Sequence, residues 1–281
     1  MGLGPENQQN QRPLADAHSE RIDRAWDSLE EGNVESAGFA AEVLMDETDE
    51  HPEVRFLFGA ALLESGLHGA ALEVLLASED LVEDRLVHRF YLATAYYENL
   101  QCERAEALFR QVLAEESDAA PPHYAIAQSL EFMGRYEEAE RHYEKAHELE
   151  NYPLPTRMKT EAFERVVQQS LEMLPEELRV HANRVAIVVE QIPTPEILRS
   201  EGEDESITPG VLGLFVGPNF KERSNFSPVA TPPTIFVYQR NLERFCQTRE
   251  ELIYEIKLTL YHEFGHYLGL SEDELDERGL S

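Results

Sequence analysis

The chain has 281 residues, which is enough for two domains that each bury a core of their own. It carries 24 Lys and Arg against 55 Asp and Glu, a formal net charge of −31, which argues against a nucleic-acid partner because phosphate backbones are bound through basic groups. Residues 1–157 hold 12 basic and 33 acidic residues and residues 158–281 hold 12 and 22, so both halves of this acidic protein favour basic or neutral partners.

The first 18 residues are rich in Gly, Pro, Asn and Gln, and we predict a disordered lead-in there. They lack the apolar core of a signal peptide, and no run of eighteen apolar residues that could span a membrane occurs. The two cysteines, Cys102 and Cys246, lie far apart, so neither a disulfide framework nor a cysteine zinc site is indicated. We therefore expect a cytoplasmic protein without a membrane partner.

From residue 19 to residue 152 the sequence repeats with a period of 34 residues. Three columns keep this period, and they read Ala37, Ala71, Ala105 and Ala139; Ala25, Gly59, Ala93 and Ala127; and Gly32, Gly66, Leu100 and Gly134. Small residues allow two helices to approach closely, and glycine makes the turn between them. The period is that of the tetratricopeptide (TPR) unit, so we predict an all-α solenoid of four TPR-like helix-turn-helix repeats rather than a generic helical bundle.

Stacked repeats of this kind form a concave groove that usually binds a peptide or protein, so we expect a protein partner there. Aromatic residues could line such a groove, although aromatics at helical spacing more often belong to a core; they are Tyr91, Tyr96, Tyr97 and Tyr124. Prolines at positions 153 and 155 end the array, because proline does not continue a helix.

A second domain is predicted over residues 156–281. A helix is expected at 156–174, and a short helix or helical turn at 176–183. Strands are expected at 185–190, 211–216 and 234–239, and a long helix at 249–267 before a short terminal one. An acidic loop over 199–205 and a longer loop over 218–233 separate the strands. This order predicts a small α+β domain with a sheet of three or four strands, and hence an α+β fold class for the whole chain.

The long helix near the C-terminus has well-defined ends. Thr248 and Glu251 form a capping box at its start, and Gly269 ends it. The apolar positions within it recur at helical spacing; they are Ile253, Ile256, Leu260 and Phe264.

This helix contains the sequence His262-Glu263-Phe264-Gly265-His266. Histidines four residues apart project from one face, close enough to share one ion, so we interpret His262 and His266 as zinc ligands. Zinc lowers the pKa of bound water to about 7, and Glu263, beside the first ligand, can then take the proton as a general base.

A third protein ligand is needed, because catalytic zinc usually takes three and a water. Glu272 is our candidate, since Gly269 allows a sharp turn that brings a side chain ten residues beyond His262 back to the metal. Asp273 is the alternative. Ser271 and Glu274 also form a capping box, so an acidic first turn of a terminal helix would by itself account for Glu272.

Residues 158–281 resemble the small single-domain zincin-like metallopeptidases, often called mini-zincins, over nearly the whole length of that domain. The matching stretches occur in the same order along the chain; they are 163–167, 174–177, 185–190, 212–215, 235–238, 249–252 and the HExxHxxGxxE sequence at 262–272. The resemblance implies a zinc-dependent peptidase scaffold. In it, His262, His266 and Glu272 would be the ligands and Glu263 the base.

Our leading hypothesis is a zinc metallopeptidase, a hydrolase of peptide bonds, whose TPR repeats recruit or regulate a protein substrate or partner. The alternative is a non-catalytic TPR adaptor with a degenerate or structural zinc domain. Glu263 favours the enzyme, because metal binding alone needs no base.

Two further features bear on a peptidase mechanism. Strand 211–216, or the strand that ends near Tyr238, could hold an extended substrate by edge pairing. Tyr238, Tyr261 and Tyr267 could donate to a tetrahedral oxyanion, but packing is the commoner role of such residues and we assign them no catalytic function.

Overall fold

The fold is that of a computed structural model, which describes residues 14–79, 81–174, 176–200, 208–218, 220 and 232–277. The chain forms two compact units, the first taking most of the residues up to Leu149 and the second most of those from Glu150. Residues 1–13 of the expected lead-in lie outside the described part, and the first described helix begins at Asp16. None of the described helices is long and apolar enough to cross a membrane.

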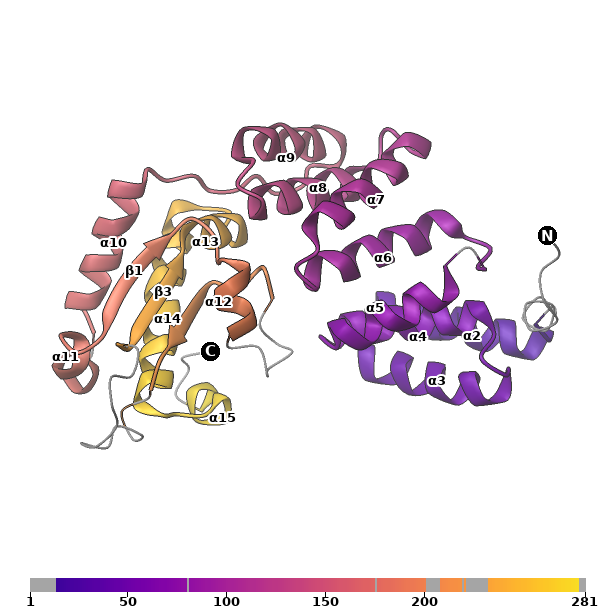
Figure 1. The fold of residues 1–281 in the computed structure, drawn as a ribbon, viewed down its shortest axis with the longest axis horizontal. Helices are drawn as coiled ribbons and strands as arrows, with labels where there is room; N and C mark the ends of the chain where they lie inside the picture. The colour runs from indigo at the N-terminus through magenta and orange to yellow at the C-terminus, as the bar shows by residue number, and fades with distance from the viewer. Residues whose placement is uncertain are drawn as a thin grey trace. The chain divides into compact units, whose positions relative to one another are not determined.

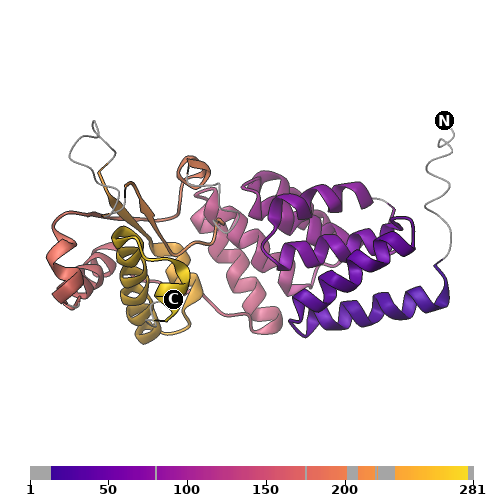
Figure 2. The same cartoon turned by 90° about the horizontal axis from the view of Figure 1, so that it is seen from below.

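The first unit is an array of helices in which each contacts the next along the chain (Figure 2). Its described helices are α2 (Asp16–Glu30), α3 (Val34–Glu47), α4 (Pro52–Glu64), α5 (His68–Ser78), α6 (Arg85–Glu98), α7 (Cys102–Glu115), α8 (Ala120–Phe132) and α9 (Tyr136–Glu150). The four alanines that begin with Ala37 are all completely buried, as close helix packing requires. The predicted TPR-like repeats are confirmed.

The turn column of the repeats adopts left-handed backbone conformations. Gly32 and Gly66 both have φ of 80°, Gly134 has 74°, and Leu100 has 60° although it carries a side chain. Each turn follows the first helix of a repeat, where a left-handed residue ends a helix and redirects the chain. Leu100 therefore adopts a conformation that suits glycine.

Leu100 is partly buried, so Leu100→Ala is the reference for the lost side chain. Relative to Leu100→Ala, Leu100→Gly is expected to raise the free energy of unfolding by about 1 kcal/mol, because relief of the left-handed strain exceeds the entropy that glycine loses on folding. The matched reversal, Gly66→Leu, has open space around the new Cβ and is expected to cost about 1–2 kcal/mol through the same strain. Urea unfolding of the full chain measures both. A Leu100→Gly chain that is no more stable than Leu100→Ala would contradict the strain argument.

The second unit is an α+β domain (Figure 1). Its described elements are α10 (Thr160–Glu172), α11 (Glu176–Ala182), β1 (Ala186–Glu190), α12 (Pro195–Ser200), β2 (Gly213–Val216), β3 (Thr234–Tyr238), α13 (Gln239–Phe245), α14 (Arg249–Leu268) and α15 (Glu272–Asp276). The sheet has the order β1-β3-β2. β1 is parallel to β3, with Ile187 opposite Ile235, and β2 is antiparallel to it, with Leu214 opposite Phe236. The predicted fold class is confirmed, with three strands in the described sheet.

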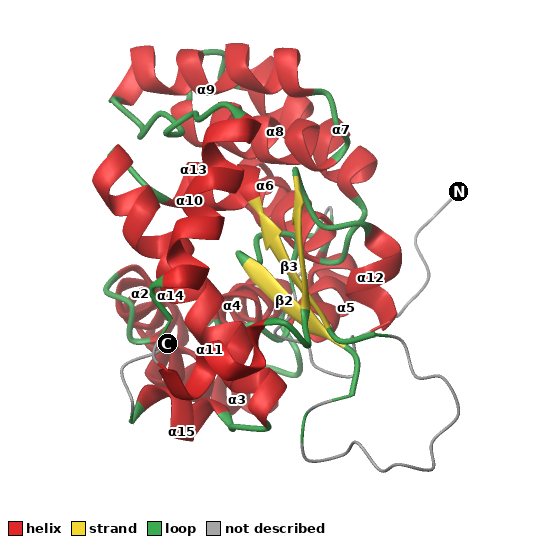
Figure 3. Ribbon diagram, turned by 90° about the vertical axis from the view of Figure 1, so that its left-hand side faces the viewer, coloured by secondary structure: helices red, strands yellow, loops and turns green. Residues whose placement is uncertain are grey.

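Helices α10 and α14 lie on the same side of the sheet (Figure 3). Apolar side chains from these helices and from the central strand form the core between them; they include Phe163, Val167, Ile235, Val237, Ile256, Leu260 and Phe264. Ile253, expected on this apolar face of α14, is instead 40% exposed, and Leu252 is completely buried. Leu252 precedes Ile256 by four residues and therefore lies more nearly in line with it along the helix.

Two short helices were not predicted. The expected acidic loop over 199–205 begins inside α12, and residues 201–207 lie outside the described part. Most of the expected loop over 218–233 lies outside it as well. α13 follows β3 directly and is held by Asn241, whose amide donates to the carbonyls of Pro209 at 2.8 Å and Val211 at 2.7 Å.

The chain segment just before α10 is hydrogen-bonded to α13 through the buried Glu243. Its carboxylate accepts hydrogen bonds from the Met158 amide at 2.9 Å and the Arg157 guanidinium at 3.1 Å. The Thr156 amide donates to the Glu243 carbonyl at 2.7 Å. These bonds join residues more than 80 positions apart, and they make 156–158 part of the second unit.

Candidate metal centre

Helix α14 has the capped ends that its sequence indicates. The Thr248 hydroxyl accepts from the Glu251 amide at 3.2 Å, and the Glu251 carboxylate accepts from the Thr248 amide at 3.3 Å. At the other end Gly269 has φ of 77°, the left-handed conformation that stops a helix and turns the chain. His262 and His266 therefore lie in the last two turns of a well-defined helix.

The chain then returns toward α14 through the short helix α15. Ser271 and Glu274 form the capping box at its start, so Glu272 is its first residue. Leu275 of α15 is completely buried and packs against α14 at Gly265. A Cβ added to Gly265 would lie only 2.2 Å from a Leu275 methyl. The glycine between the two histidines thus allows α15 to pack closely on α14, which places Glu272 near the two histidines.

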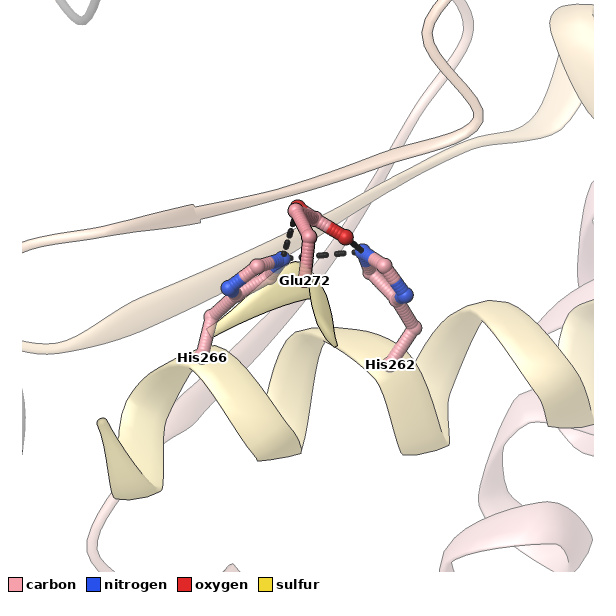
Figure 4. A group of neighbouring side chains, drawn as sticks. All are labelled: His262, His266 and Glu272. Atoms are coloured by element: carbon pink, nitrogen blue, oxygen red, sulfur yellow. Dashed lines mark hydrogen bonds and ion pairs between the residues drawn. The ribbon is translucent and has the colours of Figure 1, made fainter. Parts of the chain in front are cut away.

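Three side chains converge as a result (Figure 4). The Nε2 atoms of His262 and His266 are 2.8 Å apart. One Glu272 oxygen lies 3.2 Å from His266 Nε2, and the other lies 3.8 Å from His262 Nε2. Asp273, the alternative considered for the third position, is not part of this group.

The donor set and its dimensions fit zinc. Zinc in proteins is tetrahedral, with bonds to nitrogen and oxygen of about 2.0–2.2 Å, so neighbouring ligand atoms lie roughly 3.3–3.5 Å apart. The two imidazole nitrogens are 2.8 Å apart, and the nearer Glu272 oxygen lies 3.2 Å from His266 Nε2, so both separations are slightly below that value. Two imidazoles and one carboxylate also leave a fourth position, as catalytic zinc sites do.

The surroundings of His266 favour the neutral ring that a metal ligand needs. Burial lowers the pKa of its ring, and the neighbouring His262 lowers it further, while Glu272 and a backbone hydrogen bond at Leu270 act in the opposite direction. Neutral imidazole is the form that binds zinc. The bond to the Leu270 backbone also orients the ring.

Glu263 lies beside the three donors but faces β2. Its side chain is almost completely buried, and the Phe215 amide of β2 donates a hydrogen bond to its carboxylate. Burial raises the pKa of Glu263 to about 8; the bond from Phe215 opposes this rise, and Glu272 adds to it. A Cβ on Gly213 would lie 3.2 Å from a Glu263 oxygen and 2.5 Å from the Thr259 methyl, so this glycine makes room for the carboxylate.

The three tyrosines near the site have structural surroundings. The Tyr261 hydroxyl donates to the Met173 carbonyl at 2.9 Å. Tyr267 is buried with its ring against Phe215 and Phe220. Tyr238 is completely buried; its hydroxyl has no hydrogen-bond partner among the described residues, and burial together with the charge of Glu263 raises its pKa.

A cleft of about 230 Å³, here called the β2 cleft, opens beside Glu263. Residues 211–213 form one side of it, and α14 forms the other with Glu255, Leu258, Thr259, His262 and Glu263. β2 is an edge strand of the described sheet, whereas β3 is central and paired on both sides. Of the two strands suggested for edge pairing, only β2 therefore has an edge free of sheet partners within the described residues.

A small sheet, a helix with two histidines one turn apart and a returning carboxylate are the features expected of a zincin-like domain. Residues 182–280 match the family model of the zincin-like metallopeptidases. The resemblance inferred from the sequence is thereby confirmed for this part of the chain. The helix α10, which lies before the matched residues, contributes Phe163 and Val167 to the same core.

The N-terminal helical region is similar to solved structures of MamA. MamA AMB-1 is 24% identical, and the alignment covers 50% of this chain and 85% of that one, with a TM-score of 0.40. MamA from Desulfovibrio magneticus RS-1 is 17% identical, covering 49% and 78%, with a TM-score of 0.42. Because both scores are low, the repeat architecture rests on the 34-residue period and the helix pairs of this chain. No curated protein matches the chain.

Proposed function

We propose that the chain is a zinc-dependent metallopeptidase that hydrolyses peptide bonds. The observation that carries this proposal is the convergence of His262, His266 and Glu272 on one point, with the buried Glu263 beside them. A site that only held zinc for stability would usually be closed by a fourth protein ligand. Here the three donors are partly exposed, as a site that admits a substrate requires.

In this proposal His262, His266 and Glu272 hold the zinc ion, and each residue of the site has one role. When bound, zinc supplies Lewis acidity at the scissile carbonyl and at the attacking water. Glu263 accepts the proton of that water and later passes it to the leaving amine. The Phe215 amide holds the Glu263 carboxylate in place for both transfers.

The edge of β2 is the proposed binding site for the substrate backbone. An extended peptide would pair with β2 as an added strand, which aligns its main chain without regard to sequence. The β2 cleft lies between this strand and α14, with His262 and Glu263 in its wall. A side chain of the bound peptide would therefore enter the cleft beside the scissile bond.

We further propose that the two parts of the chain act separately, with a TPR array over 19–152 that recruits or regulates a protein substrate and a zinc domain over 156–281. Removing residues 1–155 is expected to leave one zinc bound per chain while changing which proteins are cut. Metal analysis and mass spectrometry of cleavage products measure the two effects. Loss of zinc on this truncation would count against independent domains.

A chain that begins at Thr160 is the matched control for this truncation. It lacks the donors of Arg157 and Met158 and so leaves the buried Glu243 carboxylate short of partners. We expect it to be about 3 kcal/mol less stable than the chain that begins at Thr156. Equal stability would show that residues 156–159 are not needed by the second unit.

The adaptor alternative predicts a different experimental result from the peptidase proposal. An adaptor binds partners through its repeats without producing new chain ends, whereas a peptidase produces them. Proteins retained by the Glu263→Gln variant are to be identified by mass spectrometry and compared with new N-termini produced by wild type. The peptidase proposal expects retained proteins to be among those cut by wild type; retention without any cutting supports the adaptor.

A further inference from the structure

The β2 cleft contains one acidic side chain that the proposed mechanism does not use, Glu255. It precedes His262 by seven residues and therefore lies two helical turns away on the same face of α14. At 1.5 Å per residue this places Glu255 about 10 Å along the helix from the proposed catalytic end. The cleft thus has a carboxylate at each end.

The wall between these two ends is mainly apolar. Val211, Leu212 and Leu258 contribute aliphatic side chains to it, and no Lys or Arg lines the described part of the cleft. Burial raises the pKa of Glu255, and the charge of Glu251 in the preceding turn of α14 raises it further. The far end of the cleft is therefore acidic, and the path to it is lined by hydrocarbon.

We propose that Glu255 makes the enzyme select substrates with a Lys or Arg side chain next to the scissile bond. This inference rests on the proposed peptidase function. The hydrocarbon stem of Lys or Arg would lie along Leu212 and Leu258, and the cationic end would pair with Glu255. One extended residue spans about 3.5 Å, so its backbone together with a long basic side chain matches the separation of about 10 Å.

Other side chains fit this cleft less well. A purely apolar side chain would cover Glu255 without giving its carboxylate a partner, and burying an unpaired charge is costly. An acidic side chain would meet the charges of Glu255 and Glu251. The formal charge of −31 acts in the same direction, because it attracts cationic substrates and repels anionic ones.

The test uses the full chain loaded with zinc and three unstructured peptides that differ only in Arg, Leu or Glu beside the cleaved bond. Wild type is expected to cleave the Arg peptide with a kcat/KM roughly tenfold to a hundredfold above that of the Leu peptide, as a charge-assisted hydrogen bond implies. Glu255→Gln should abolish most of this preference while still cleaving the Leu peptide. Glu255→Arg should shift the preference to the Glu peptide.

Glu250→Gln is the matched control, because it removes the same charge from an exposed position of α14 that does not line the cleft. Its preference should equal that of wild type. Ratios between peptides are unaffected by a reduced fraction of folded protein, so a partly unfolded variant still gives a result. Cleavage by wild type without a basic preference would overturn this inference alone, and absence of any cleavage by wild type would overturn the proposed function as well.

Discussion

Replacement of Glu263 by Gln is expected to lower kcat/KM for peptide hydrolysis by roughly 10² to 10⁴, the range found for loss of a general base. Glutamine has the shape of glutamate, and its amide oxygen can still accept the bond from the Phe215 amide. It cannot accept a proton from water. Steady-state kinetics on an unstructured peptide, with the zinc content of each sample measured, gives the comparison.

The zinc content separates the two possible reasons for lost activity. Because Glu263 is not among the three converging donors, the variant is expected to bind one zinc per chain, as wild type does. Glu250→Gln is again the control and should keep full activity. If wild type holds zinc but never cuts anything that the variant leaves intact, even with a protein bound to the repeats, the adaptor alternative is correct.

Replacement of His266 by Ala is expected to abolish the stabilisation of the second unit by zinc. A ligand present at a thousand times its Kd stabilises the folded state by about 4 kcal/mol. For a unit of this size that corresponds to a rise in Tm of about 10–20 °C. Calorimetry with and without added zinc should show this rise in Tm for wild type and no rise for His266→Ala. The control variant His147→Ala, in the first unit, should show the same rise as wild type.

The same measurement identifies the third ligand. Glu272→Gln removes the carboxylate nearest the two imidazoles, at 3.2 Å from His266 Nε2, and should weaken zinc binding at least about tenfold. Asp273→Asn removes the same charge one residue later and should leave zinc binding nearly unchanged. The reverse order would make Asp273 the ligand, and a full rise in Tm for His266→Ala would exclude the proposed metal centre.

The sequence predicted the parts of this protein that depend on neighbouring residues. Glycine at three of the four turn positions, together with buried alanines, specified the repeats through close packing and left-handed turns. Capping residues at Thr248 and Ser271 marked the start of α14 and α15. Within α14, the spacing of His262 and His266 follows from helix geometry alone, and Gly269 predicted the turn after it.

Other features of the site involve residues far apart in the sequence. α13 was missed because Asn241 is a poor helix former whose helix is held by the carbonyls of Pro209 and Val211. The hydrogen bond of the Tyr261 hydroxyl could not be predicted from the sequence either, because its partner is the carbonyl of Met173, 88 residues earlier.

The features of this protein therefore fall into two groups. Some are determined by interactions between neighbouring residues, and others by contacts between distant segments. A capped helix with histidines one turn apart can be predicted from a short stretch of sequence. Helix geometry alone places such residues on one face, independently of the rest of the fold. The burial of Glu263, the edge position of β2 and the place of Glu255 in a cleft arise only when β2 packs against α14. Pairing of strands and their packing on a helix depend on contacts between distant segments, which local sequence preferences do not encode.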